Sequence, residues 1–288
     1  MNELLNRIFK LMPDKMYINL KYYYRLKKRI NWKNPQTYNE KLQWLKVYYH
    51  RKDLWKYVDK YEVKEIIGEI IGKDHIIPTL GVWNNFDEID FDKLPDQFVL
   101  KCTHDSGSIV ICKDKSSFDK EEAKKALEKA LKTESFWGGR EYPYKFVKPR
   151  IIAEKFMEDA VEKELRDYKF FVFDGKARYM FIATDRENKE VDTCFDFYDM
   201  DFNHLDLRHG HPNAKKEIKK PSNFDEMRVM AEKLGANFPH VRVDFYEVNG
   251  VTYFGEMTFY HHCGFMNFDP DKWDYEFGKC LKLPEKIV

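Results

Sequence analysis

The sequence predicts an α+β fold in which helices come first and antiparallel sheet follows. Three observations carry this prediction. Residues 1–72 place apolar, aromatic and basic residues at helical spacings. From about residue 75, short runs of β-branched and aromatic residues alternate with turn residues. Near the C-terminus, Asn249-Gly250 separates two such runs, and Asn-Gly is the strongest short-range signal for a β-hairpin.

The helical part of the prediction rests on end signals and on periodicity. Thr37 precedes Glu40 by three residues, which is the spacing of a capping box at the start of a helix. The next helical segment is expected to end at Gly72, because glycine readily ends helices. The later segment EEAKKALEKALK has the amphipathic pattern of a surface helix. NFDEMRVMAEKLGA is expected to form a helix with Asn223 as its N-cap and Gly235 near its end.

The expected strands follow from about residue 75. Each is a short run rich in Val, Ile, Phe and Tyr that is bounded by turn residues. Asp174-Gly175 marks a second tight hairpin in addition to the one at Asn249-Gly250. The runs are IIPTLGVW, QFVLKCTHDSGSIVICK, RIIAEKF, YKFFVFDGKARYMFIAT and CFDFYDM, followed by VRVDFYEV and VTYFGEMTFY.

Composition and charge exclude several classes of protein. The net charge of +1 gives no general attraction to nucleic acid. No run of about 18 apolar residues predicts a membrane-spanning helix, and the N-terminus lacks the features of a signal peptide. The five cysteines form no C-x-x-C pair, which predicts free thiols in a reducing cytosol and argues against zinc. We therefore expect a cytoplasmic protein.

The first 60 residues are strongly basic. They contain 11 Lys and 4 Arg against 5 Asp and Glu, which gives a net charge of +10. Such a segment suits an anionic partner or an anionic surface, for example the inner face of a membrane. A solvated helical face is the alternative, and the sequence leaves both open.

The final hairpin carries charges within strands that look half-buried. Arg242 and Asp244 are two residues apart and so point to one face, and Glu256 and Thr258 have the same spacing on the partner strand. Counted from the turn, Asp244 and Glu256 share a face only if the register carries a bulge or a small offset. Two carboxylates on one face repel each other unless a cation neutralises them, and oxygen ligands suit Mg²⁺. Surface carboxylates on the wet side of a sheet are the alternative.

A second motif lies in FVLKCTHDSGS. Lys101 comes at the end of a strand, and Ser106, Gly107 and Ser108 form a turn with free backbone N–H groups. A lysine beside such a loop can cradle phosphates, although Gly/Ser turns are common. The chain has neither G-x-x-x-x-G-K-[ST] nor G-x-G-x-x-G, so the sequence disfavours P-loop and Rossmann nucleotide sites.

In combination, these stretches resemble the ATP-grasp superfamily and, more closely, its TupA-like branch, found among bacterial cell-surface polysaccharide proteins. The resemblance covers most of the chain and rests on the order and spacing of the pieces. It implies two antiparallel sheets that hold ATP, with a helical segment (1–72), a small subdomain with the phosphate loop (73–155) and a large subdomain with the metal site (156–288). The pieces are NPQTYNEKLQWLK, DKYEVKEIIG, LPDQFVLKCTHDSGS, PRIIAEKF, DYKFFVFDGK and VRVDFYEV with YFGEMTFY.

The resemblance also implies the nucleotide contacts. Lys60 and Lys101 look like two lysines that contact ATP phosphates, and the loop 106–108 looks like one that closes over them. Asp167, or Glu164 as the alternative, lies where the superfamily has an acidic residue on the ribose. The segment whose backbone would read adenine is Glu154, Lys155, Phe156 and Met157.

The same resemblance implies the catalytic metal and its ligands. Asp244, Glu256 and Thr258 match the residues that would hold Mg²⁺. Many members have asparagine where this chain has Thr258, and a threonine hydroxyl can coordinate but has less reach. Lys101 would neutralise charge during phosphoryl transfer, and Arg242 matches an arginine that stabilises negative charge on the reacting acyl group.

The implied enzyme is an ATP-dependent carboxylate–amine ligase that acts through an acylphosphate. By family association its substrates are an acidic sugar of a surface glycan and an amine or amino acid, at or near the inner membrane face. Arg140 in REYPYK and the pair His261 and His262 are candidate acceptor contacts, with partly exposed turn histidines as the alternative. A sugar kinase with the same ATP site, a glycosyltransferase and a non-catalytic ATP-grasp scaffold are the other functions considered.

Overall fold

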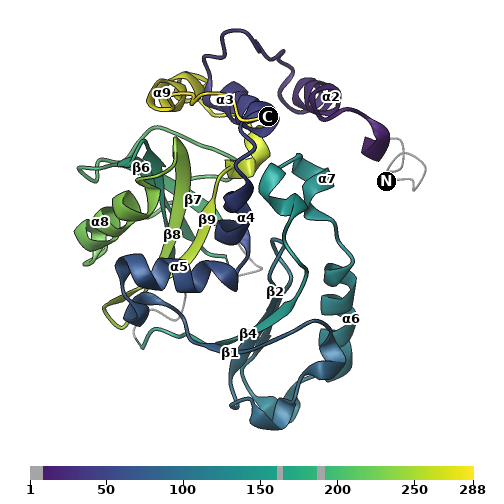
Figure 1. Cartoon of the computed structure of the whole chain (residues 1–288). Coiled ribbons are helices and arrows are strands. Elements are labelled where there is room, and N and C mark those ends of the chain that lie inside the picture. The colour runs from purple at the N-terminus through teal and green to yellow at the C-terminus, as the bar shows by residue number, and fades with distance from the viewer. Residues whose placement is uncertain (1–8, 161–164, 187–191) are drawn as a thin grey trace.

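The computed structural model describes residues 9–160, 165–186 and 192–288 and contains two antiparallel sheets with helices packed around them (Figure 1). The smaller sheet has the strand order β1-β4-β2-β3, and the larger sheet has the order β7-β6-β5-β8-β9. Neighbouring strands are antiparallel in both sheets. The arrangement confirms the predicted α+β class with two antiparallel sheets.

The described elements have the following bounds. The smaller sheet consists of β1 (Thr79–Trp83), β2 (Phe98–Cys102), β3 (Ile109–Cys112) and β4 (Ile151–Lys155), and the larger sheet of β5 (Asp167–Phe173), β6 (Lys176–Thr184), β7 (Cys194–Asp199), β8 (His240–Val248) and β9 (Val251–Thr258). The α-helices are α2 (Asp14–Leu26), α3 (Tyr38–Tyr48), α4 (Trp55–Val58), α5 (Glu62–Ile71), α6 (Lys120–Leu131), α7 (Ser135–Gly139), α8 (Phe224–Gly235) and α9 (Lys272–Cys280). The 3₁₀-helices are η1 (Lys52–Leu54), η2 (Lys73–His75), η3 (Phe86–Glu88), η4 (Phe91–Lys93), η5 (Lys115–Ser117), η6 (Tyr142–Lys145) and η7 (His261–Gly264).

Two predicted helix ends are confirmed. At the start of α3, Thr37 Oγ1 accepts a hydrogen bond from the Glu40 backbone N–H at 3.2 Å, and Glu40 Oε2 accepts one from the Thr37 backbone N–H at 3.1 Å. This reciprocal pair is the capping box that the sequence predicts. Helix α5 ends at Gly72, whose φ of +103° favours glycine over other residues.

The main core covers both faces of the larger sheet. Phe170 of β5 contacts Phe224 of α8 on one face, with ring centroids 5.8 Å apart. On the opposite face, the adjacent Phe171 contacts Phe277 of α9 and Tyr38 of α3, with centroids 5.1 and 6.4 Å apart. Burial from both sides explains why β5 is an almost continuous apolar run.

The smaller sheet has a separate core. Phe98 of β2 packs against Phe91 and Phe118, and Leu127 of α6 is buried in the same cluster. Helix α6 therefore covers one face of this sheet, as its amphipathic sequence predicts (Figure 1). The opposite face is turned toward the larger sheet, and the candidate site lies between the two.

The β8–β9 hairpin contains the bulge that its charges require. From the turn, the pairs run in regular register as far as Phe245 opposite Phe254. The register then shifts by one residue at Gly255, so Asp244 lies opposite Glu256. A Cβ atom at Gly255 would lie 3.1 Å from the Asp244 carbonyl oxygen, which explains why the extra residue is glycine. Of the two conditions under which the carboxylates could share a face, a bulge or a small offset, the structure has the bulge, which brings the two carboxylates together.

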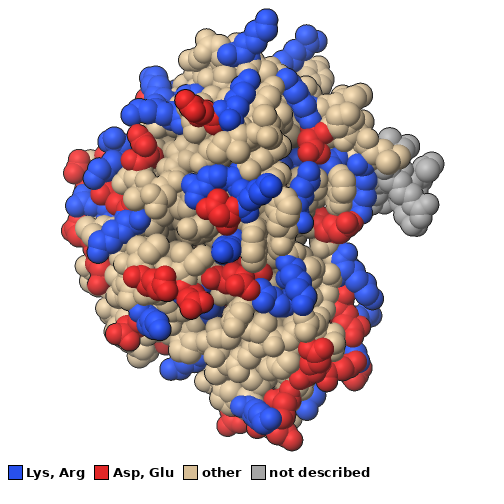
Figure 2. Space-filling model, viewed as in Figure 1, with Lys and Arg blue, Asp and Glu red and all other residues tan. Residues whose placement is uncertain are grey.

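Basic side chains stand out at the end of the molecule where α2, α3 and α9 lie (Figure 2). Acidic side chains are prominent at the opposite end, over the smaller sheet and α6 (Figure 2). Within the part of the chain that the structure describes, no helix has both the length and the apolar character needed to cross a bilayer.

Candidate active site

A cavity of about 180 Å³ lies where the two sheets face each other. It brings together most of the residues that the sequence linked to a nucleotide. The smaller sheet and its loops contribute Lys101, Ser106, Gly107 and Glu154, and the larger sheet contributes Asp167, Lys169, Tyr246 and Glu256. Lys60 and Lys64 come from the helical segment that precedes β1.

Glu154 connects two lysines on the smaller-sheet side of the cavity. Its carboxylate lies 2.7 Å from Lys101 Nζ and 2.6 Å from Lys64 Nζ, and the residue is buried. Burial alone would raise the pKa of Glu154, but the two ammonium groups outweigh it and lower the pKa to about 2. Lys64, from α5, was missed from the sequence. Its role depends on the packing of a helix against a sheet, which no local pattern shows.

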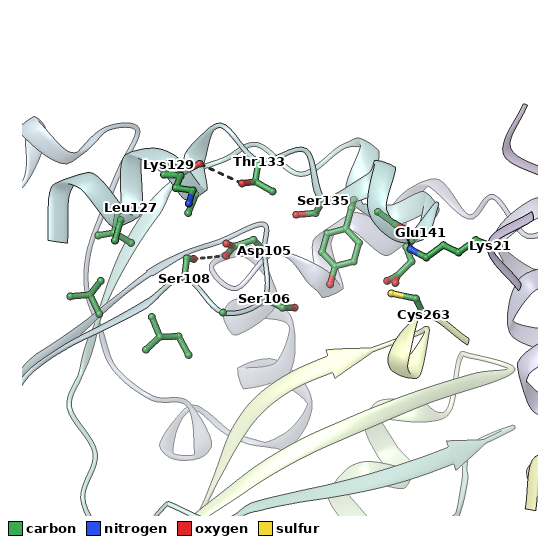
Figure 3. A pocket seen from close by; sticks show the side chains of 18 residues that line it. Lys21, Asp105, Ser106, Ser108, Leu127, Lys129, Thr133, Ser135, Glu141 and Cys263 are labelled. Atoms are coloured by element: carbon green, nitrogen blue, oxygen red, sulfur yellow. Dashed lines mark hydrogen bonds between the residues drawn. The ribbon is translucent and has the colours of Figure 1, made fainter. Parts of the chain in front are cut away.

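Lys60 and the loop after β2 are bonded to each other. The Lys60 ammonium donates to the carbonyl oxygens of Asp105 and, at 3.2 Å, of Cys102. Ser108 Oγ accepts from the Cys102 backbone N–H at 3.0 Å and donates to the Asp105 carboxylate (Figure 3). The Ser108 hydroxyl thus closes the loop on itself and does not line the small cavity. Gly107 does line it, with a φ of +105° and open space where a Cβ would be.

The predicted adenine-reading segment is split between two cavities. Glu154 lines the small cavity, whereas Lys155 and Phe156 line a different one of about 720 Å³, together with Leu80 and Lys113. Met157 follows β4 and is half-buried. A backbone contact of this segment with adenine remains a prediction.

Asp167 lies at the start of β5 with its side chain almost fully buried. One carboxylate oxygen is 3.4 Å from Lys169 Nζ, and the other pairs with Arg186. If Asp167 contacts the ribose as predicted, its carboxylate would do so while also paired with Lys169 and Arg186. The alternative residue, Glu164, lies outside the described residues.

Arg242 lies at the centre of the predicted metal site. Its Nε donates to Asp244 Oδ1 at 2.7 Å, and its Nη2 lies 2.7 Å from Asp244 Oδ2. The same Nη2 lies 2.8 Å from Glu256 Oε1 and 2.9 Å from Thr258 Oγ1. The predicted arginine and the three predicted metal ligands therefore form one cluster.

Lys169 is a further member of this cluster that sequence reasoning missed. It lies opposite Asp244 in the β5–β8 ladder, and its ammonium pairs with Asp244 Oδ2. Burial would raise the pKa of Asp244, but Arg242 and Lys169 lower it to about 2. Burial lowers the pKa of Lys169, and its carboxylate neighbours partly offset this. The signal in the sequence was a lysine within the apolar run DYKFFVF.

The donor set of this cluster fits Mg²⁺. Arg242 Nη2 lies within 2.9 Å of three oxygen atoms, one each from the Asp244 carboxylate, the Glu256 carboxylate and the Thr258 hydroxyl. The three oxygens therefore already surround a positively charged group. Hard divalent cations prefer such oxygen ligands. The Glu256 side chain is 43% exposed and lines the cavity, so this carboxylate is accessible.

Arg140 has a different position from the one expected of a substrate contact. Its side chain is 1% exposed and pairs with Asp14 at 3.2 Å. Its guanidinium also donates to the Phe9 carbonyl and lies over the rings of Tyr17 and Trp137, at 4.5 and 4.4 Å. Arg140 therefore ties α2 to α7, and this burial contradicts the expected contact with an acceptor.

The two adjacent histidines also differ from expectation. His261 is 1% exposed and lies behind Arg242, whose Nη1 is 2.7 Å from His261 Nδ1. An acceptor cannot reach His261 while Arg242 occupies this position, so a direct contact is contradicted. His262 is half-buried, with a left-handed φ of 47°. Its proposed contact with an acceptor remains a prediction.

A larger cavity of about 810 Å³ adjoins the loop after β2 (Figure 3). It shares Ser106 and Gly107 with the small cavity, so the two meet at the loop. Glu141, Tyr144 and Cys263 line its other side. Burial raises the pKa of the Glu141 carboxyl and lowers that of the nearby Lys46 to about 8. Glu141 and Tyr144 belong to REYPYK, the stretch that the sequence analysis considered as an acceptor contact, and that contact remains a prediction.

Comparisons with known proteins give one family and several solved structures. The model of the TupA-like ATP-grasp family matches residues 40–282. No curated protein matches the chain in sequence.

Among solved structures, D-alanine–D-alanine ligase from Bacillus anthracis has 16% identity and a TM-score of 0.41, over 76% of this chain and 58% of that one. L-amino acid ligase from Bacillus licheniformis has 12% identity and a TM-score of 0.48, over 82% and 52%. Biotin carboxylase from Campylobacter jejuni has 14% identity and a TM-score of 0.44, over 81% and 48%. The matched part is about half the length of these enzymes.

Proposed function

The chain belongs to the TupA-like ATP-grasp family, and we propose that it is an ATP-dependent ligase that joins a carboxylate to an amine through an acylphosphate. The observation that supports this most directly is the Arg242 cluster, in which Asp244, Glu256 and Thr258 offer oxygen ligands beside a cavity lined by lysines. The match covers only about half of the solved enzymes. The complete reaction is therefore proposed for this chain and does not follow from the comparison.

In the proposed reaction, Lys60 and Lys101 bind the phosphates of ATP and neutralise their charge. Lys101 exchanges its ion pair with Glu154 for a phosphate oxygen, while Glu154 keeps its pair with Lys64. The acceptor carboxylate attacks the γ-phosphorus, and the bond to ADP breaks. Asp244, Glu256 and Thr258 would hold Mg²⁺, which would supply charge neutralisation at the phosphates.

The second step joins the amine to the acyl group. The amine nitrogen attacks the acyl carbon, the phosphate leaves with the bonding electrons, and the amine loses a proton. Arg242 stabilises the oxyanion that forms at the acyl carbon, and loss of such a donor typically lowers the rate by about 10²–10³-fold. No nucleophilic side chain of the enzyme takes part.

The finer part of the proposal concerns the acceptor. We propose an acidic sugar of a surface polysaccharide as the carboxylate substrate and an amine or amino acid as the nucleophile. The support is the TupA-like resemblance together with the larger cavity beside the phosphate loop. At about 810 Å³, this cavity has the size of a ligand pocket, and hydroxyl groups and Lys21 and Lys129 line it.

We further propose that α2 contacts the inner face of the membrane from the cytoplasm. Met16, Leu20, Tyr23 and Tyr24 are all at least half exposed and follow one side of the helix. The surrounding segment carries the excess of lysine and arginine. A cosedimentation assay tests this: binding to vesicles with anionic lipid and not to neutral vesicles, weakened by Leu20→Ser, is expected. Recovery with neither kind of vesicle would argue for a solvated helix.

Calorimetric titration with Mg·ADP is the first test of the nucleotide site. We expect binding by the wild type and at least tenfold weaker binding by Asp244→Asn, because loss of even an outer-shell partner of a metal ligand typically lowers metal affinity by about 10–100-fold. Glu247→Gln is the matched control, because this carboxylate lies on the same hairpin and bonds to Ser222 outside the cluster. Binding of UDP-sugars without Mg·ADP binding would instead support a glycosyltransferase.

Hydroxylamine separates the ligase from a kinase. It converts an acylphosphate into a hydroxamate, whereas a sugar phosphate does not react with it. Incubation with ATP, hydroxylamine and a panel of uronic acids is therefore expected to give a hydroxamate. A stable sugar phosphate under the same conditions would favour the kinase, and the absence of both products in a chain that binds Mg·ADP would favour the scaffold.

A further inference from the structure

Three histidines meet behind Arg242. His261 and His262 belong to η7, which follows β9, and His209 comes from the long connection between β7 and α8. One potential ligand atom from each of the three histidines lies within 4.8 Å of the others, which is close enough to hold a metal ion. Of the three, His209 was not singled out from the sequence.

Two of these histidines form a chain of hydrogen bonds that starts at Arg242. Arg242 Nη1 lies 2.7 Å from His261 Nδ1. His261 Nε2 lies 3.2 Å from His209 Nδ1, and His209 Nε2 lies 3.3 Å from the carbonyl oxygen of Met266. The chain therefore runs from the candidate active site to the backbone of the segment after η7.

Donor chemistry fixes the direction of every bond in this chain. A guanidinium only donates, so His261 Nδ1 must accept and His261 must be neutral, with its proton on Nε2. That proton is donated to His209 Nδ1. His209 is then also protonated on Nε2 and donates to the Met266 carbonyl, which only accepts. Both imidazoles are thus held in one tautomer by groups that have no alternative role.

The surrounding side chains hold the rings in place. His209 stacks on Phe268, with ring centroids 3.9 Å apart. His261 makes a T-shaped contact with Phe171, with centroids 5.0 Å apart. Both histidines are 1% exposed. Burial and the Arg242 charge lower the pKa of His261, which favours the neutral form that the bonding requires.

This pattern disfavours a metal ion at the histidine group. Coordination by His261 Nε2 would move its proton to Nδ1, where it would face an Arg242 N–H at 2.7 Å. Two donors at that distance repel each other. A role of His261 as a general base is equally disfavoured, because the ring is buried and its available lone pair already accepts from Arg242.

We propose that His261 and His209 are positioning residues that fix the rotation of the Arg242 guanidinium. One edge of the guanidinium is held by Asp244 through Nε and Nη2, and Nη1 is held by His261. If Mg²⁺ were bound by the carboxylates of Asp244 and Glu256, Arg242 would lose its hydrogen bonds to them and would keep the one to His261. The effect on catalysis rests on the proposed function. The hydrogen-bonding pattern itself can be tested without a substrate.

The test compares glutamine and leucine at the same positions. Glutamine offers one acceptor and one donor, as the neutral imidazole does, whereas leucine offers neither. In ¹⁵N NMR spectra at neutral pH, we expect His261 and His209 of the wild type in the Nε2–H form. Because Asp244 still holds Nε and Nη2 in the leucine variants, the readout is Nη1. Its protons are expected to exchange slowly with water in the wild type and in His261→Gln, and faster in His261→Leu and His209→Leu.

Several outcomes would overturn the inference. They are a protonated or Nδ1–H His261 in the wild type, Arg242 Nη1 protons that exchange no faster in His261→Leu, and a Co²⁺ absorption band that appears in the wild type and is lost in His209→Leu. Should the leucine variants fail to fold, the wild-type tautomers and His261→Gln still decide the matter.

Binding of Mg·ADP separates this inference from the proposed function. If the wild type shows the expected tautomers but does not bind Mg·ADP, the proposed function fails and the positioning role stands. If Mg·ADP binds and the tautomers differ, the positioning role fails and the function stands. In the hydroxamate assay, once a substrate is found, His261→Leu is expected to lower turnover with the Km for ATP unchanged, and His261→Gln to restore most of it.

Discussion

Replacement of Glu154 by glutamine removes the carboxylate that pairs with Lys64 and Lys101. The ordinary carboxyl pKa of 4.5 falls to about 2 in the folded chain, where the two ammonium groups outweigh burial. A depressed pKa stabilises the folded state above the unfolded-state value and loses this effect as the pH falls through the folded-state value. Since each pH unit between the two pKa values is worth about 1.4 kcal/mol, the ionised carboxylate contributes about 3 kcal/mol at pH 7.

The same reasoning fixes the dependence on pH. At pH 3, most of this carboxyl group is protonated in the unfolded chain and still ionised in the folded chain, and about 1.4 kcal/mol of the contribution remains. We therefore expect Glu154→Gln to lower the free energy of unfolding by about 3 kcal/mol at pH 7 and by about half of that at pH 3.

Urea unfolding followed by circular dichroism at the two pH values measures both differences. Glu158→Gln is the matched control, because Glu158 is exposed and only four residues away. Its effect is expected to be small at both pH values. An effect of Glu154→Gln that is the same at pH 7 and pH 3 would refute the electrostatic account and leave loss of packing as the cause.

Three further predictions concern packing and hydrogen bonds. Gly278→Ala would place a Cβ 2.2 Å from the Gln36 carbonyl oxygen, so we expect a loss of about 2 kcal/mol or more in thermal unfolding, and an unchanged melting temperature would contradict the close contact of α9. Arg140→Met should destabilise the chain by about 1–3 kcal/mol and leave Mg·ADP affinity unchanged by calorimetry; weaker binding with normal stability would return Arg140 to the site. Tyr38→Phe removes the 2.7 Å bond to His240 and should cost about 1 kcal/mol in urea unfolding, with no cost if that bond is unimportant.

Local sequence patterns predicted much of the fold. The capping box at Thr37 and the turn at Asn249-Gly250 each follow from neighbouring residues, because short-range chemistry decides them. The bulge in β9 was only a condition under which the two carboxylates could share a face. The pairing of Asp244 with Glu256 follows once the hairpin register is known.

Contacts between distant segments were less accessible to this reasoning. Lys64 reaches Glu154 only after α5 packs into the core of the larger sheet and the smaller sheet comes alongside, and His209 reaches His261 from a long connection. Arg140 illustrates the opposite error: a basic residue in a loop with charged neighbours looks exposed, yet α2 covers it. Lys169 lay within reach of the sequence argument, since a charge in an apolar strand is the same signal that identified Arg242.

The bulge at Gly255 also divides the hairpin into two parts with separate constraints. In β9, successive side chains alternate between the two faces of the sheet, and the bulge reverses which residues point to which face. The stretch next to the turn and the stretch that contains Glu256 therefore alternate in opposite phase. The position of the charged end is set by the β5–β8 ladder and the bulge, and the turn at Asn249 does not determine it. The tip of the hairpin is therefore the natural place to lengthen the chain or insert a label, because added residues there leave the phase of the active-site strand intact.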